Sequence, residues 1–204
     1  MMFEIDPELT PRTQSYNDFI NAPMPMVTLF KTIDVTRLVK KSRQGYKYNM
    51  LMCYCIGQAA KRIPEMLFQI REKTMLKYDK FAIDVIVGTK SGALGYCDVP
   101  VVDDLEEFNR LYLERTAAVR DSGENMYITD SSIICTSALV KYDIDGVVNL
   151  YHTIYDHPFL AWGKSTRQWF RTKQKLSFQW HHVIMDGVHA CRFLEETERA
   201  IGRL

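Results

Sequence analysis

Residues 176–188 read LSFQWHHVIMDGV, and this stretch decides what fold the rest of the chain must support. From Leu176 to Trp180 apolar and polar residues alternate, which is the pattern of a β-strand with one buried face. From Val188 onward apolar residues recur at helical spacing, and Asp186 stands where it can cap that helix. The sequence therefore predicts a strand that passes into a helix through a short turn, and the turn carries two histidines, a carboxylate and a glycine.

The rest of the chain mixes strand and helix patterns without a regular rhythm or an internal repeat. The predicted strands are 26–34, 68–70, 75–78, 81–87, 133–140, 159–163 and 176–180. The predicted helices are about 36–41 with Asp34 or Thr36 as the cap, 49–63, 105–121 and 188–204. Residues 1–22 form an irregular start in which 15–20 could be a short helix or a turn, and 88–95 are a predicted loop. This pattern predicts an α/β two-layer sandwich, with helices packed on one mixed sheet. No linker-like segment divides the chain, so we expect a single domain over residues 1–204.

Composition and charge exclude several classes of protein. The chain has 204 residues, 47% of them hydrophobic and 25% charged, which is the balance of an ordinary globular protein with a sizeable core. A net charge of +1 gives no electrostatic footprint for nucleic acid or an anionic membrane. No apolar run approaches a membrane span, and the acidic N-terminus lacks a signal pattern, so we expect a cytoplasmic protein. The five cysteines are odd in number and lie in apolar runs, which predicts buried free thiols rather than disulfides.

The histidine pair is the best candidate for chemistry. Adjacent strand residues point to opposite faces, so one of His181 and His182 should pack structurally while the other projects. A projecting neutral imidazole is suited to general-base catalysis, and Asp186 can cap the helix or pair with an arginine from elsewhere in the chain. Residue chemistry alone leaves this function and a purely structural role about even.

The other histidines support weaker hypotheses. His152, His157 and His189 are taken as structural, because a lone histidine is more often structural than catalytic. A metal site using His182, Asp186 and His189 is conceivable, but no further ligand spacing supports it, so no metal is expected.

Trp180 to Leu194, reading WHHVIMDGVHACRFL, resembles the active-site signature of the chloramphenicol acetyltransferase family. That signature is a histidine pair, three residues, Asp-Gly, and then a helix with His and Arg-Phe. Further matches in the same order are Arg12 with Tyr16 and Phe19, Ile33–Thr36, Pro64-Glu65, Gly123-Glu124 and Gly163-Lys164. Taken alone, the signature is shared with other acyl-CoA-using enzymes, including the dihydrolipoamide acyltransferase cores.

The resemblance implies a CoA-dependent acyltransferase that uses acetyl-CoA as co-substrate and acts on chloramphenicol or another small hydroxyl compound. It also implies a homotrimer with active sites at subunit interfaces. His182 would be the general base for direct attack of the acceptor hydroxyl on the thioester, and Asp186 would pair with Arg12 to hold the loop. Tyr16 and Phe19 would lie at the substrate site.

Two departures from the family pattern affect the expected site. The family's serine that donates to the oxyanion aligns near Val140-Lys141-Tyr142, where no serine stands. Lys141 or the Tyr142 hydroxyl could donate instead, as could Ser137 if the register slips, or the donor is missing. A segment that helps wall the chloramphenicol pocket corresponds to Ala22–Met26, which lacks its aromatic residue.

Three rival hypotheses therefore remain. The first is an enzyme with a different small hydroxyl acceptor. The second is a catalytically weak relative that binds a ligand or acyl-CoA. The third is a metal-dependent hydrolase built on the histidine cluster.

Overall fold

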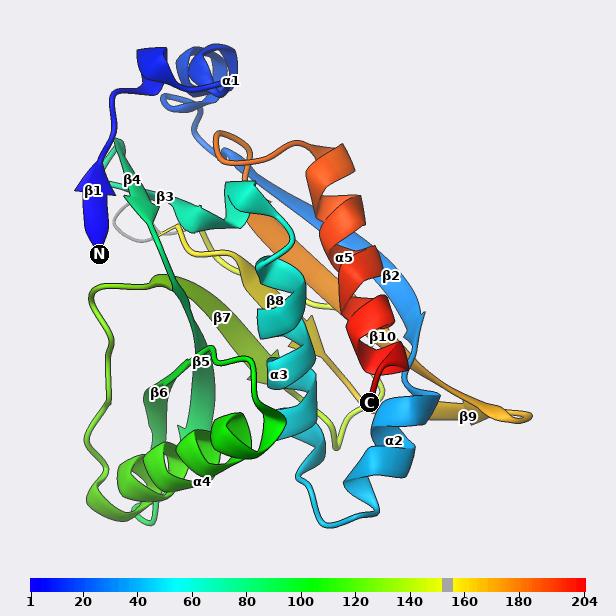
Figure 1. The fold of residues 1–204 in the computed structure, drawn as a ribbon. Helices are drawn as coiled ribbons and strands as arrows, with labels where there is room; N and C mark the ends of the chain where they lie inside the picture. Colours follow the sequence, from blue (N-terminus) through cyan, green and yellow to red (C-terminus); the bar gives the residue numbers. More distant parts are fainter. Residues whose placement is uncertain (152–155) are drawn as a thin grey trace.

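In a computed structural model of the protein, which describes residues 1–151 and 156–204, helices lie on one face of a mixed β-sheet (Figure 1). Within these residues the main sheet has seven strands. Their order is β2 (Met26–Asp34), β10 (Arg171–His181), β8 (Phe159–Trp162), β7 (Ser132–Ala138), β5 (Phe81–Gly88) and β6 (Leu94–Pro100), and β9 (Thr166–Gln168) pairs with the start of β10. The central strands β5, β7 and β8 run parallel, whereas β10 and β6 run antiparallel to their neighbours. The predicted α/β two-layer class is confirmed.

A second, small sheet stands beside the first. Its described strands follow the order β1 (Met2–Glu4), β4 (Thr74–Tyr78) and β3 (Phe68–Arg71), all antiparallel. Two short 3-10 helices, Pro7–Leu9 and Pro64–Leu67, lead into α1 and β3.

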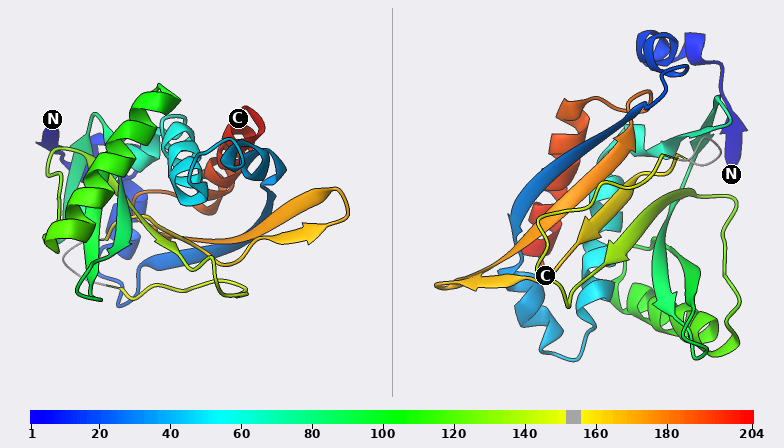
Figure 2. Two further views of the ribbon diagram at one scale, coloured as in Figure 1. Left: turned by 90° about the horizontal axis from the view of Figure 1, so that it is seen from below. Right: turned by 180° about the vertical axis from the view of Figure 1, so that it is seen from behind.

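The helices form the second layer, which Figure 2 shows edge-on above the sheet. They are α2 (Thr36–Ser42), α3 (Tyr48–Ala60), α4 (Leu105–Ser122) and α5 (Gly187–Gly202), while α1 (Thr13–Phe19) lies apart, at the end of the sheet where β10 ends (Figure 1). Helix α3 is buried on most sides because it packs between α5 and α4, which explains its almost continuous apolar sequence.

Both faces of β10 are buried, although the sequence predicts only one. Phe178 packs on Trp180 and on Phe193 of α5, with ring centroids 5.2 Å and 4.8 Å away. On the opposite face, Gln179 accepts a hydrogen bond from the Asn149 N–H (2.8 Å) and donates one to the Asn149 carbonyl (3.1 Å). The segment that follows β7 therefore covers part of the sheet face that carries no helices (Figure 2).

Three strands were not predicted. β1 lies in the expected irregular start, β6 begins inside the predicted 88–95 loop, and β9 forms a hairpin with β10 that projects from the body (Figure 1). At the hairpin tip Trp169 and Phe170 are each 89% exposed.

Smaller features also differ from expectation. The strand predicted to reach Val140 ends at Ala138. The N-cap of α2 is Val35, although the Asp34 carboxylate accepts hydrogen bonds from the N–H and the hydroxyl of Thr36. All five cysteines are free, and Cys53, Cys55 and Cys97 are buried, but Cys191 is exposed. No described helix is long and apolar enough to cross a membrane.

Candidate active site

The loop between β10 and α5 is held by one arginine from the start of the chain. Arg12, which is only 7% exposed, donates from Nε to the Val183 carbonyl (2.8 Å) and from Nη2 to the His182 carbonyl (3.0 Å). Its two terminal nitrogens also bind both oxygens of Asp186, at 2.7 Å and 2.8 Å. Such a two-pronged, charge-assisted contact fixes orientation as well as distance. The guanidinium therefore ties α1 to three residues of the loop at once.

The carboxylate of Asp186 binds Arg12, while its backbone forms the N-terminal cap of α5. The Arg12 hydrogen bonds lower the pKa of Asp186 below its ordinary value. Asp186 is the N-cap of α5, and its N–H donates to Nδ1 of His189 (3.1 Å). His189 thus has the structural role expected of it.

The two histidines have opposite environments, as strand geometry predicts. His181 ends β10 almost completely buried: its Nδ1 accepts from the Val183 N–H (3.2 Å), and its Nε2 lies 3.7 Å from Asp156. Burial lowers the pKa of His181 to about 4 and raises that of Asp156 to about 7, so both groups are pushed toward their neutral forms.

His182 is the histidine that projects. Its side chain is 30% exposed, and its ring lies 4.3 Å from the Phe19 ring of α1, with the planes inclined at 32°. Its Nδ1 is buried without a hydrogen-bond partner among the described residues, so the accessible edge of the ring carries Nε2. Asp186 lies 3.7 Å from that Nδ1, which is too long for a hydrogen bond.

The structure brings Arg12, Phe19, His182 and Asp186 together, but it does not bring every expected site residue to them. The Tyr16 hydroxyl donates to the Lys73 carbonyl (2.7 Å) and so ties α1 to the turn between β3 and β4. Lys141 and Tyr142 lie exposed in the turn after β7. Because β7 runs opposite to β10, this turn lies at the far end of the sheet from His182 in the same chain.

Ser137 lies on β7 itself, half-buried, in register with Ala161 of β8, which pairs with Ser177 of β10. Two strand spacings make roughly 10 Å across the sheet, and the five residues from Ser177 to His182 make roughly 16 Å along it. Within one chain Ser137 is therefore far from His182.

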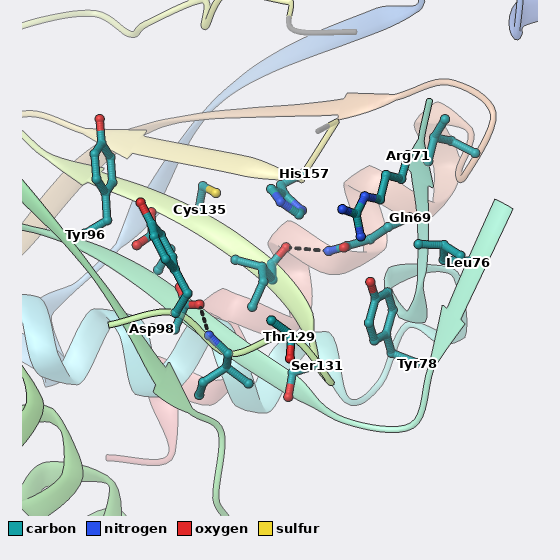
Figure 3. A pocket seen from close by; sticks show the side chains of 15 residues that line it. Gln69, Arg71, Leu76, Tyr78, Tyr96, Asp98, Thr129, Ser131, Cys135 and His157 are labelled. Atoms are coloured by element: carbon teal, nitrogen blue, oxygen red, sulfur yellow. Dashed lines mark hydrogen bonds between the residues drawn. The ribbon is translucent and has the colours of Figure 1, made fainter. Parts of the chain in front are cut away.

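A cavity of about 540 Å³ opens on the sheet, and sequence reasoning missed it. Its walls come from the small sheet, from β5, β6 and β7, from residues 127–131, and from His157 (Figure 3). The sequence signal was Asp84, a lone charge inside the apolar strand FAIDVIV. His157, expected to be structural, lines this cavity, whereas His152 lies outside the described residues.

A metal site using His182, Asp186 and His189 finds no support in the geometry. Asp186 is engaged by Arg12 and His189 Nδ1 by a backbone N–H. Across residues 1–151 and 156–204 no three His, Cys, Asp or Glu side chains gather as a metal ion would require.

Sequence comparison finds the same family that the motif resembles. A family model described as chloramphenicol acetyltransferase matches residues 3–198. Chloramphenicol acetyltransferase 3 of Escherichia coli is 24% identical over 180 residues, which cover 84% of this chain and 83% of the relative. Chloramphenicol acetyltransferase 2 of Escherichia coli is 25% identical over 177 residues, covering 82% and 81%.

Solved structures show the same fold at lower identity. A chloramphenicol acetyltransferase superposes with a TM-score of 0.86 at 18% identity, covering 98% of this chain and 100% of the other. A probable dihydrolipoamide acetyltransferase from Listeria monocytogenes superposes with a TM-score of 0.71 at 14% identity, covering 98% and 94%.

Proposed function

Because the chain belongs to the chloramphenicol acetyltransferase family and is therefore an acyltransferase, we propose that it transfers the acetyl group of acetyl-CoA to a hydroxyl of a small molecule, with His182 as general base. The observation that carries this proposal is the clamped imidazole. Phe19 packs on one side of the ring, and Arg12 binds the carbonyl groups of His182 itself and of the next residue, Val183. A base held in this way needs no reorganisation before it takes a proton.

In the proposed reaction Nε2 of His182 takes the proton of the acceptor hydroxyl while that oxygen attacks the thioester carbonyl. This role requires the ring proton on Nδ1, and the Asp186 carboxylate 3.7 Å away favours that tautomer electrostatically. The tetrahedral oxyanion then collapses, the carbon–sulfur bond breaks, and the thiolate of CoA receives the proton. No acyl-enzyme forms.

We assign the oxyanion donor to Ser137 of a second copy of the chain. Ser137 stands on β7, on the sheet face opposite Thr136, which packs under α3 against Cys53. Lys141 and Tyr142 are the alternatives, but their exposed turn holds them less firmly than a strand holds Ser137. Because Ser137 is distant from His182 of its own chain, the two residues can meet only across a subunit interface. The assignment therefore requires the homotrimer with interfacial sites that the family resemblance implies.

The acceptor hypothesis includes chloramphenicol but is not limited to it. Ala22–Met26 runs from the end of α1 into the first residue of β2, beside His182, whose N–H donates to the Pro25 carbonyl (2.8 Å). This segment carries no aromatic side chain, so the wall it forms differs from that of the chloramphenicol pocket the motif implies.

The deciding experiment is thiol release from acetyl-CoA by the purified protein, with chloramphenicol and then with a panel of small hydroxyl compounds. Turnover that falls by about a hundredfold to ten-thousandfold in His182→Ala, with acetyl-CoA still bound, supports the general base. His189→Ala separates loss of the base from loss of loop order, since it removes the imidazole that accepts the Asp186 N–H but has no proposed chemical role. Acetyl-CoA binding without turnover of any acceptor would indicate a weak relative, and equal turnover in wild type and His182→Ala would contradict the assignment.

A further inference from the structure

The cavity beside the sheet holds two carboxylates that the proposed mechanism does not use. Asp84 of β5 and Asp98 of β6 stand directly opposite each other in the antiparallel register, and both line the cavity. They are 8% and 2% exposed. Like charges in direct opposition destabilise a strand pair. The pair is therefore a cost to the fold unless one carboxyl takes up a proton or a positive group lies against it.

The two carboxylates differ in the partners they already have. Oδ2 of Asp98 accepts from the Ile128 N–H (2.6 Å), and the Arg115 guanidinium donates to the Asp98 carbonyl. The Asp84 carboxyl is contacted by the backbone of Cys97 and Val85 and by the Cys135 thiol, but its Oδ1 is buried and has no hydrogen-bond partner among the described residues. An unsatisfied buried carboxylate oxygen is unfavourable, so Asp84 marks the place where a donor is missing.

The walls around Asp84 suit an organic cation. Tyr96 lines the cavity with Tyr127, and after burial the largest cause that raises the pKa of the Tyr127 phenol is the charge of Asp84. Tyrosine rings attract cations through their faces. Arg71 lies at the other end, with Gln69 and Tyr78, away from Tyr96 and Asp98 (Figure 3). The volume of about 540 Å³ lies within the range of small-molecule sites.

The cavity is linked to the end of β10 through one pair of neighbouring residues. His157 lines it, and the preceding residue, Asp156, lies 3.7 Å from His181, next to His182. Its position on the sheet face without helices leaves it accessible to a neighbouring copy.

We propose that this cavity binds the ammonium group of a small amine through Asp84, and that the acetyl acceptor is an amino alcohol rather than a neutral alcohol. The second half rests on the proposed acetyl transfer. The first half, amine binding, stands on the cavity alone.

The test compares phenylethanolamine with phenylethanediol, two compounds of the same shape that differ in an ammonium group against a hydroxyl. Titration calorimetry measures their binding to wild-type protein, to Asp84→Asn and to Asp121→Asn, an exposed carboxylate-to-amide control at the end of α4. We expect wild type to bind the amine about 10- to 100-fold more tightly than the diol, and Asp84→Asn to lose that preference. Asp121→Asn should keep it.

Equal affinity of wild type for the two compounds would overturn the proposal, and this comparison needs no variant to fold. An unchanged preference for the amine in Asp84→Asn would also overturn the proposal. So would a failure of both compounds to bind because a cationic side chain of another copy fills the cavity. Thiol release from acetyl-CoA separates the two halves. Amine binding without release of thiol removes acetyl transfer and leaves the cation site, whereas equal turnover of both compounds keeps acetyl transfer and removes the preference.

Discussion

Arg12 is buried to 7% exposure and directs its guanidinium at two carbonyls and one carboxylate of the same loop. Replacement of Asp186 by alanine leaves the arginine its two carbonyl acceptors but removes its counter-charge. Breaking a buried pair costs several kcal/mol, but Asp186 is 42% exposed, so solvent screening reduces the cost here.

We expect Asp186→Ala to lower the free energy of unfolding by about 1–3 kcal/mol and to lower kcat more than it raises KM, because the base loses its fixed position. Urea denaturation and steady-state kinetics measure these two effects. Asp186→Asn keeps one acceptor oxygen and should fall between wild type and alanine. A fully stable Asp186→Ala protein would contradict the role given to the ion pair.

Whereas the Arg12–Asp186 ion pair stabilises the folded protein, ionisation of Asp84 destabilises it, and this effect depends on pH. Burial first, and then the charge of Asp98, raise its pKa from 3.8 to about 7. Below the lower value both folded and unfolded states are protonated; between the two values only the unfolded state ionises, so stability declines as pH rises. Above about pH 7 the penalty reaches about 4 kcal/mol, at 1.36 kcal/mol per pKa unit.

Asp84→Asn should therefore become more stable relative to wild type as pH rises through that interval. The measurement is the free energy of unfolding of each protein at about pH 4 and about pH 8. Asp121→Asn provides the baseline. Parallel pH profiles for wild type and Asp84→Asn would show that the carboxyl is not held in its neutral form.

At the scale of elements, the contact between β6 and α4 leaves no room for a side chain at residue 95. A side chain at Gly95 would bring its Cβ within 2.6 Å of Val119, which is fully buried in α4. Gly95→Ala should destabilise the fold by about 1–3 kcal/mol by pushing strand and helix apart. Gly88→Ala, at the end of β5 with no atom within 4 Å, is the matched control.

A double-mutant cycle checks this geometry by chemical denaturation. Val119→Ala removes the opposing methyl groups, so the pair of changes should cost less than the sum of the single costs. Additive costs would show that the two positions do not interact.

The elements also show which parts of the fold are readable in sequence. β5 and α3 are largely apolar runs, and β2 and α4 have clean periodicity, so each was predicted close to its observed bounds. β6 was missed because Gly95 and Asp98 interrupt its apolar pattern. Tertiary structure explains both residues, since α4 approaches the strand at Gly95 and Asp98 forms part of the cavity wall. For the site, the motif indicated the loop that Arg12 binds, and the catalytic role of His182 stays a prediction. The cavity depends on the pairing of β5 with β6 and β7, which no local pattern specifies.

At the scale of the whole molecule, the proposed site needs two chains. If His182 of one copy works with Ser137 of another, His182→Ala and Ser137→Ala are each defective for different reasons, the serine change by about a hundredfold to a thousandfold. Co-folding the two variants in equal amounts should restore activity at about a quarter of the sites, where each neighbour supplies the residue that the other lacks. Sedimentation of the mixture as one trimeric species is the accompanying measurement. No recovery in mixed trimers would place the oxyanion donor elsewhere.

The hairpin of β9 and β10 gives the molecule a built-in optical reporter. Trp169 is 89% exposed at its tip, whereas Trp162 and Trp180 are buried at 1% and 0%. The three indoles should therefore fluoresce in two populations, one red-shifted and open to iodide quenching, the other blue-shifted and shielded. Binding of another copy or of a different molecule to the hairpin will change the fluorescence of Trp169. The fluorescence of the two buried tryptophans will stay the same and serve as an internal standard.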